Sequence, residues 1–129
     1  NKNKRNIIIA VVLLILLCIA PFWPNIKQAV APDAVSGTGD YGLMQINSIN
    51  HEWLSEIGFD VMTYDGNIEA GIYIISQHLN KYGKPELALM AYTSGPTGAQ
   101  KLWDAGTFQT DYSRKVMAAF EHWTSVLEG

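Results

Sequence analysis

The most informative stretch of this chain is Ser36-Gly37-Thr38-Gly39-Asp40-Tyr41-Gly42-Leu43-Met44-Gln45-Ile46-Asn47. Its glycines allow backbone conformations with positive φ and let a ligand approach the main chain closely. Asp40 can carry negative charge, and the side-chain amides of Gln45 and Asn47 can both donate and accept hydrogen bonds. Ligands with many hydroxyl groups need such partners, so we predict that the stretch forms one wall of a sugar-cleaving cleft.

The same stretch contains the spacing Gly37-x-Gly39-x-x-Gly42, which in a βαβ unit binds the phosphates of a dinucleotide. That motif requires an apolar strand before it. Residues 29–36 are too few for a buried parallel strand, and Pro32 interrupts them. The context therefore disfavours nucleotide binding.

Charge and cysteine content exclude other classes of function. The formal charge of the chain is −3, but residues 24–129 hold 6 basic and 12 acidic groups, which gives them a net charge of −6. Phosphates require clustered Lys and Arg, so we expect no nucleic-acid partner. Cys18 is the single cysteine, and a disulfide framework or a thiolate zinc site is not expected.

The N-terminal segment has the layout of a membrane anchor. A cationic flank at residues 1–6 precedes the apolar run Ile7–Ala20, which Pro21-Phe22-Trp23 extends with aromatic residues typical of a membrane interface. Residues 7–23 as a helix would span roughly 26 Å, near the short end of what a bilayer core requires. The positive flank predicts a single-pass anchor with a cytoplasmic N-terminus and the remaining chain outside.

Two other interpretations of this segment stay open. Ala29-Val30-Ala31 has the small-x-small form of a signal-peptide cleavage site, although it lies far from the apolar run. The apolar run is also compatible with a buried helix of a soluble core.

Hydrophobic periodicity predicts helices after the glycine-rich stretch. The clearest is a helix over residues 67–82, with Asp65 as its capping acceptor and Gly83 as its stop. Further helices are expected over residues 48–57, 85–95, 97–105 and 110–127. The predicted fold class is all-α, or α+β at most, with a small β or irregular element around residues 33–42.

Four motifs in this order resemble those of the lytic transglycosylases. Tyr41–Asn47 is similar to the family's Gly-Leu-Met-Gln motif, and also to the matching stretch of animal-type lysozymes. Tyr64–Gly71 resembles the family's Asn-Ile-x-x-Gly helix, Ala91–Gly95 its Ala-Tyr-Asn-x-Gly turn, and Tyr112–Val116 its terminal Tyr-x-x-x-Val. The resemblance implies a small lysozyme-like helical domain over residues 24–129, shortened at its N-terminal end, after a membrane anchor over residues 1–23.

The resemblance also implies site residues. Asp40 aligns with the second acid of lysozymes, so it is the candidate catalytic residue; the alternative is a turn aspartate that bonds its own backbone. The candidate substrate-binding residues are Met44, Gln45, Asn47, Tyr92, Thr93 and Tyr112. Each has a structural alternative: the amides can bond the motif's own main chain, Met44 can fill a gap, and the tyrosines can belong to the core. Thr93 stands where the family has Asn.

The family's proton donor has no counterpart at the expected place. In the family a Glu-Ser pair precedes the segment that here is Pro32–Ser36, and the ungapped pair falls on Lys27-Gln28. Residues 1–32 contain no Asp or Glu, and a Lys, with a reference pKa of ~10.4, is a poor proton donor near neutral pH. Either the apolar segment replaces the family's first buried helix, or the anchor is joined to the interior of a domain that lacks its acid-bearing piece.

The function implied by the resemblance is cleavage of the glycan strands of peptidoglycan, without metal or cofactor. Together with the predicted anchor over residues 7–23, this function implies that the domain lies on the wall side of a bacterial cytoplasmic membrane. The alternative, motivated by the missing acid, is a non-catalytic domain that binds peptidoglycan. The sequence makes no prediction of oligomeric state.

Overall fold

The computed structural model describes residues 35–129, which divide into two compact units. The described part of one unit ends at Tyr73, and the other comprises Ile74–Gly129, so the division falls within helix α4 (Tyr64–Tyr82). The units are described separately below. The predicted anchor over residues 1–23 and the Lys27-Gln28 pair lie outside the described residues.

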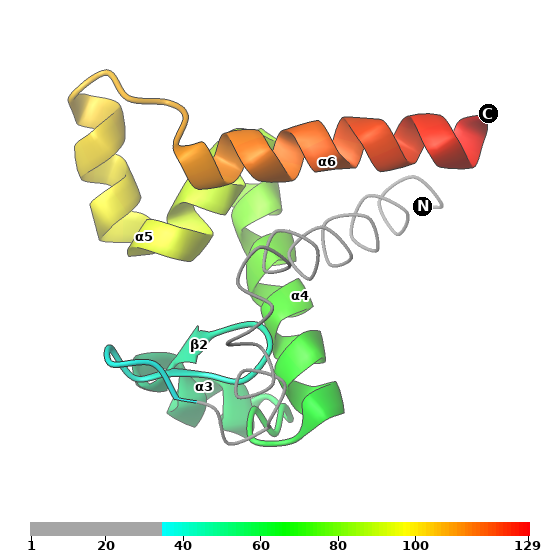
Figure 1. The fold of residues 1–129 in the computed structure, drawn as a ribbon. Coiled ribbons are helices and arrows are strands. Elements are labelled where there is room, and N and C mark those ends of the chain that lie inside the picture. The colour runs from blue at the N-terminus through cyan, green and yellow to red at the C-terminus, as the bar shows by residue number, and fades with distance from the viewer. Residues whose placement is uncertain (1–34) are drawn as a thin grey trace. The chain divides into compact units, whose positions relative to one another are not determined.

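The described part of the unit that ends at Tyr73 opens with a small antiparallel hairpin (Figure 1). Strand β1 (Asp40–Tyr41) pairs with β2 (Ile46–Asn47), with Asp40 opposite Asn47 and Tyr41 opposite Ile46. The 3₁₀ helix η2 (Ser48–Asn50) and helix α3 (His51–Glu56) follow directly. The β element was predicted around residues 33–42. It extends to residue 47, because the glycine-rich motif itself supplies both strands.

Helix α4 begins earlier than the sequence pattern predicts. The pattern placed its start at residue 67 with Asp65 as the cap, but the helix starts at Tyr64 and Asp65 lies in its first turn. The side chain of Thr63 supplies the cap, since its Oγ1 accepts a hydrogen bond from the backbone N–H of Gly66 at 3.1 Å. A hydroxyl just ahead of a helix satisfies a donor that the first turn leaves unpaired.

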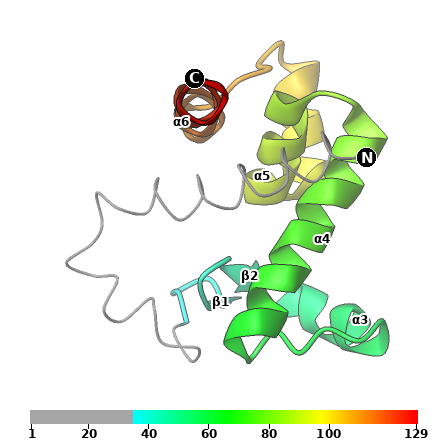
Figure 2. The ribbon, with the colours of Figure 1, turned by 90° about the vertical axis from the view of Figure 1, so that its right-hand side faces the viewer.

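The hairpin and α3 lie beside the first turns of α4 (Figure 2), and all three contribute buried side chains to the core of this unit. Its buried apolar side chains are those of Met44, Ile46, Leu54, Val61 and Ala70. The motif segment therefore contributes to the core as well as to the surface of the unit.

The second unit contains the rest of α4, helix α5 (Pro85–Asp104) and helix α6 (Asp111–Glu128). Proline at the first position of α5 suits a helix start, because its missing N–H would have no partner there. Gly95, with φ 70° and ψ 159°, interrupts α5 and divides it into two helical pieces. The prediction of separate helices on either side of Gly95 agrees with this break.

The core of the second unit is built where α5 packs against its neighbours. Met90, Ala91 and Ala99 are buried and contact the half-buried Tyr82, Leu87, Leu102 and Trp103. Val116 of α6 is buried as well. Within residues 35–129, no helix has the length and apolarity needed to cross a bilayer.

Candidate functional site

The motif turn between β1 and β2 is fixed by its own backbone. Gly42 has φ 70° and Gln45 has φ 50°, both in the left-handed region. The backbone N–H of Gln45 donates to the carbonyl of Gly42 at 3.1 Å, and the side-chain Nε2 of Gln45 donates to the same carbonyl at 2.8 Å. Gln45 remains exposed, so one of its hydrogen-bonding groups holds the turn while the side chain stays at the surface.

Asp40 lies at the centre of a network of side-chain donors. Its Oδ1 accepts a hydrogen bond from Nδ2 of Asn47 at 2.9 Å. Its Oδ2 accepts from Oγ of Ser36 at 2.8 Å and from Oγ1 of Thr38. Its backbone N–H donates to Oγ of Ser36 at 2.9 Å, which closes the loop around the carboxylate.

These contacts set the ionisation state of Asp40. Partial burial acts to raise the pKa of its carboxyl, but the hydrogen bonds from Thr38, Asn47 and Ser36 together outweigh burial and hold the pKa below its ordinary value of 3.8. Asp40 is therefore ionised at neutral pH. It can stabilise positive charge on a ligand, and it cannot act as the proton donor for a leaving oxygen.

Asn47 links the hairpin to the helix that follows. Its Nδ2 donates both to Asp40 and to the carbonyl of Thr38, the latter at 3.0 Å. Its Oδ1 accepts from the backbone N–H of Ile49 at 3.2 Å and so caps η2. The amide thus bonds the protein through both its nitrogen and its oxygen, which is the structural alternative weighed for this residue.

Met44 occupies the core of the unit. It is 1% exposed, and a Cβ at Gly71 of α4 would lie 2.5 Å from its Cε. Met44 was considered as a substrate-binding residue or as a residue that fills a gap. Its buried position supports the second role, in the core beneath the motif.

Asn67 joins the motif to α4, a role that sequence reasoning missed. It is 2% exposed, and its Oδ1 accepts a hydrogen bond from the backbone N–H of Met44 at 2.9 Å. Its Nδ2 donates to the carbonyls of Tyr41 at 3.0 Å and Val61 at 2.9 Å. The available signal was the Asn-Ile-x-x-Gly motif, in which this Asn stands 26 residues after Tyr41 and 23 residues after Met44.

His51 closes the other side of the hairpin. Its Nε2 lies 3.0 Å from the carbonyl oxygen of Ile46, and its ring meets the ring of Tyr41 edge-on at 4.7 Å. These two contacts hold the imidazole ring of His51 against the hairpin.

The remaining candidates lie in the second unit. Tyr92 and Tyr112 are half-buried, on α5 and α6 respectively. Thr93 is exposed, and its Oγ1 donates to the carbonyl of Leu89 at 3.0 Å. The structure thus brings Asp40, Gln45 and Asn47 together on one hairpin, and it carries Tyr92, Thr93 and Tyr112 in the other unit.

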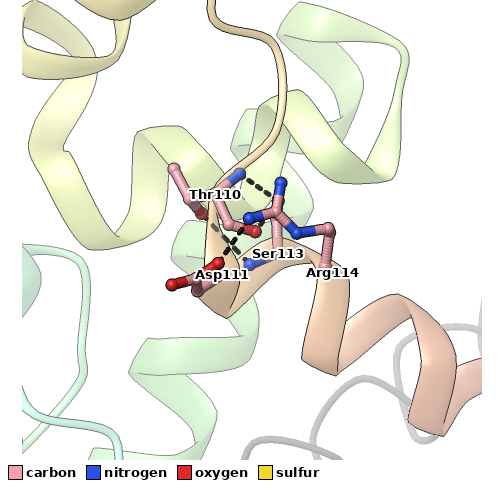
Figure 3. A network of polar contacts seen from close by, with 4 residues as sticks. All are labelled: Thr110, Asp111, Ser113 and Arg114. Carbon is pink, nitrogen blue, oxygen red and sulfur yellow. Dashed lines mark hydrogen bonds and ion pairs between the residues drawn. The ribbon is translucent and has the colours of Figure 1, made fainter.

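The N-terminus of α6 places Tyr112. The backbone N–H of Ser113 donates to Oγ1 of Thr110 at 3.1 Å, and the backbone N–H of Thr110 donates to Oγ of Ser113 at 2.8 Å (Figure 3). This reciprocal pair is a capping box. An exposed ion pair between Arg114 and Asp111 lies beside it.

His78 on α4 also has a shifted pKa. Burial, and secondly the charge of Lys81, hold its pKa below the ordinary value of 6.5. Its ring lies 5.9 Å from that of Tyr82. Among residues 35–129, no group of three or more His, Cys, Asp or Glu side chains is placed to hold a metal ion.

Comparison with known proteins gave one match. The family model described as the transglycosylase SLT domain matches residues 29–114. Searches of curated proteins and of solved structures gave no significant match. The matched range includes the hairpin, Asn67 and the segment around Tyr92.

Proposed function

The chain belongs to the transglycosylase SLT domain family, and we propose that its motif hairpin holds the glycan strands of peptidoglycan. The carrying observation is that the ionised Asp40, whose carboxylate accepts three side-chain hydrogen bonds, lies on the same hairpin as the exposed side chain of Gln45. A fixed carboxylate and an amide on a rigid turn match the hydroxyl and acetamido groups of amino sugars. In this proposal Gln45 contacts the sugar, while Asn47 and Ser36 hold Asp40 in place.

Cleavage of the bound strand is the second candidate function, and the family match favours it. Breaking a glycosidic bond requires an acid that protonates the leaving oxygen. Asp40 does not fill that role because its pKa is lowered, and residues 1–32 contain no Asp or Glu. Asp40 would instead stabilise the positive charge that develops on the sugar, as the ionised acid of a glycosidase pair does. Resemblance to the family implies participation of the substrate's acetamido group and an anhydro sugar product.

We further propose that residues 7–23 anchor the chain in a bacterial cytoplasmic membrane, with the domain on the wall side. The support is the cationic flank and the apolar run of the sequence. The chain should stay in the membrane fraction after alkaline extraction, and protease added outside spheroplasts should digest residues 35–129. Release into the soluble fraction would contradict the anchor.

Retention on insoluble peptidoglycan tests binding. The full chain in a non-ionic detergent should co-sediment with purified cell walls. Gln45→Asn keeps a residue that tolerates positive φ but shortens the side chain, so retention should fall by about tenfold. The control is Gln77→Asn, at an exposed glutamine of α4. Equal retention of the two variants would remove Gln45 from the site, and no retention of the unmodified chain would overturn the proposal.

Release of soluble fragments tests cleavage separately. Muropeptides with anhydro ends that disappear with Asp40→Asn would establish cleavage and place Asp40 in it. Release that persists in this variant would remove Asp40 from the mechanism. Retention without any release would establish the non-catalytic function.

A further inference from the structure

A row of exposed apolar side chains runs along η2 and α3. It consists of Ile49, Trp53 and Ile57, which are 80%, 38% and 50% exposed. They stand four residues apart in the sequence: Ile49 lies in the 3₁₀ helix η2, Trp53 in α3, and Ile57 is the residue that caps the C-terminus of α3. Leu54, which follows Trp53 in the sequence, is by contrast fully buried. We call Ile49, Trp53 and Ile57 the α3 row.

The middle of the row is held rigidly. Nε1 of Trp53 donates to Oδ1 of Asn50 at 3.0 Å, and the indole ring lies 6.3 Å from the ring of Tyr73 on α4. Phe59 supports Tyr73 from a ring distance of 5.3 Å. A pre-ordered tryptophan loses little conformational freedom when a partner covers it, which is typical of an interface anchor.

The described residues of this unit, 35–73, carry charged side chains of a single sign. Residues 35–73 contain no Lys or Arg, and their acidic residues are Asp40, Glu52, Glu56, Asp60, Asp65 and Glu69. Protein surfaces normally mix both signs. Glu52 and Glu56 are exposed on α3 beside the row, and Asp60 is exposed just after it.

These observations identify the chemistry of the partner. We propose that the α3 row is a docking surface for a cationic amphipathic helix of another protein, whose apolar side covers the row and whose Lys and Arg meet Glu52 and Glu56. Helices of this kind bind through apolar anchors at intervals of three and four residues. Complementary charge sets the orientation and speeds the encounter.

Other occupants fit the row less well. An anionic lipid surface would repel the acidic residues around it. A second copy of the chain would bring the same acidic face against itself. A glycan could stack on Trp53, but Ile49 and Ile57 offer no hydrogen bonds to its hydroxyl groups.

The test uses the full chain in a non-ionic detergent, passed over two immobilised synthetic helical peptides. Both carry the same Leu face; one has Lys on its polar face, and the other has equal numbers of Lys and Glu. The Lys peptide should bind at least about tenfold more tightly than the neutral one. Its binding should weaken strongly between about 0.1 M and about 1 M salt, where the Debye length falls from roughly 10 Å to 3 Å.

Paired variants locate the binding. Ile49→Ser with Ile57→Ser should lower the affinity for the Lys peptide by about tenfold or more, while Val126→Ser with Leu127→Ser on α6, 55% and 76% exposed, should leave it unchanged. Glu52→Gln with Glu56→Gln should reduce both affinity and salt dependence, unlike the exposed pair Glu121→Gln with Glu128→Gln. The detergent is the same for every variant, so any attraction of the peptide to micelles cancels.

Several results would overturn the proposal. They are equal loss of binding in the α6 variants, equal binding of the neutral peptide, and displacement of the Lys peptide by peptidoglycan fragments. A change of oligomeric state, or loss of liposome binding, caused by Ile49→Ser with Ile57→Ser would assign the row to a second copy or to lipid. Gln45→Asn should not alter peptide binding, so this test and that of glycan binding fail independently.

Discussion

Asn67 of α4 accepts a hydrogen bond from the backbone N–H of Met44 at 2.9 Å and thereby joins the helix to the motif hairpin. The same side chain donates to the carbonyls of Tyr41 and Val61. One amide therefore satisfies three backbone groups, two in the hairpin and one in the segment just ahead of α4. Since those groups are withdrawn from water, their loss of a partner is costly.

Replacing this amide should loosen the motif. We expect Asn67→Ala to lower the free energy of unfolding by about 1–3 kcal/mol, because the N–H of Met44 loses its acceptor. Asn80→Ala, at an exposed position of the same helix, should have little effect. Chemical denaturation measures the loss, and hydrogen exchange at the amide of Met44 should accelerate. Unchanged exchange there would contradict the role of Asn67.

Gly71 should tolerate no side chain. Glycine in a helix is usually improved by alanine, by about 1 kcal/mol. A Cβ at Gly71 would lie 2.5–2.8 Å from three atoms of Met44, so Gly71→Ala should instead destabilise the protein by about 1–3 kcal/mol. Gly37→Ala, in a turn where nothing lies within 4 Å of the added carbon, is a control for the added methyl group without a clash. In thermal denaturation, the changes in melting temperature caused by the two substitutions should have opposite signs or should clearly differ in size.

Acid should weaken the hairpin through Asp40. The folded-state pKa of Asp40 lies below 3.8, so the unfolded chain binds more protons at acidic pH. The stabilisation is present above pH 3.8 and is lost as the pH falls through the folded-state pKa. Asp40→Asn should flatten this part of the curve of unfolding free energy against pH. An unchanged acid limb in the variant would show that Asp40 makes no such contribution.

The ionisation of His78 should affect the stability of the protein at a higher pH than that of Asp40 does. Because its folded-state pKa is lowered from 6.5, the unfolded chain takes up the proton first, and stability should decline as the pH falls below 6.5. The decline should stop once the pH is below the folded-state pKa. His78→Gln should remove this step and leave the step of Asp40 in place. Nuclear magnetic resonance titration of the ring would verify the lowered pKa directly.

The cap of α6 makes a separate contribution. Thr110→Ala removes the acceptor for the backbone N–H of Ser113 and should cost about 1 kcal/mol of stability. Thr107→Ala, at an exposed threonine that has no part in this cap, serves as the control. Faster hydrogen exchange in the first turn of α6 would locate the effect. The exposed pair Arg114 and Asp111 should contribute little, as surface ion pairs generally do.

The helices were largely predictable because their signals are local. The apolar periodicity of α4, Pro85 at the start of α5 and the break at Gly95 all depend on residues within a few positions of one another. The early start of α4 was missed because Thr63 and Asp65 are both capping residues by type. Only the observed bond from Gly66 decides between them.

The site was less predictable because its contacts span longer distances in the sequence. Asn67 meets Met44 across 23 residues, and no local pattern encodes that contact. Asp40 was recognised as an acid, but its lowered pKa depends on how Ser36, Thr38 and Asn47 are placed by the turn. The exposure of side chains near the end of α6 has no local signal either, since Leu127 is apolar and is nevertheless 76% exposed.

Gly71 and Met44 belong to two different motifs, and the size of the Met44 side chain limits the size of the residue that position 71 can hold. Gly71 has ordinary helical geometry, so the position is glycine for lack of space rather than for backbone freedom. Among natural relatives, a larger residue at the place of Gly71 should therefore occur together with a smaller one at the place of Met44. Covariation of this kind would mark the two motifs as a single unit of selection.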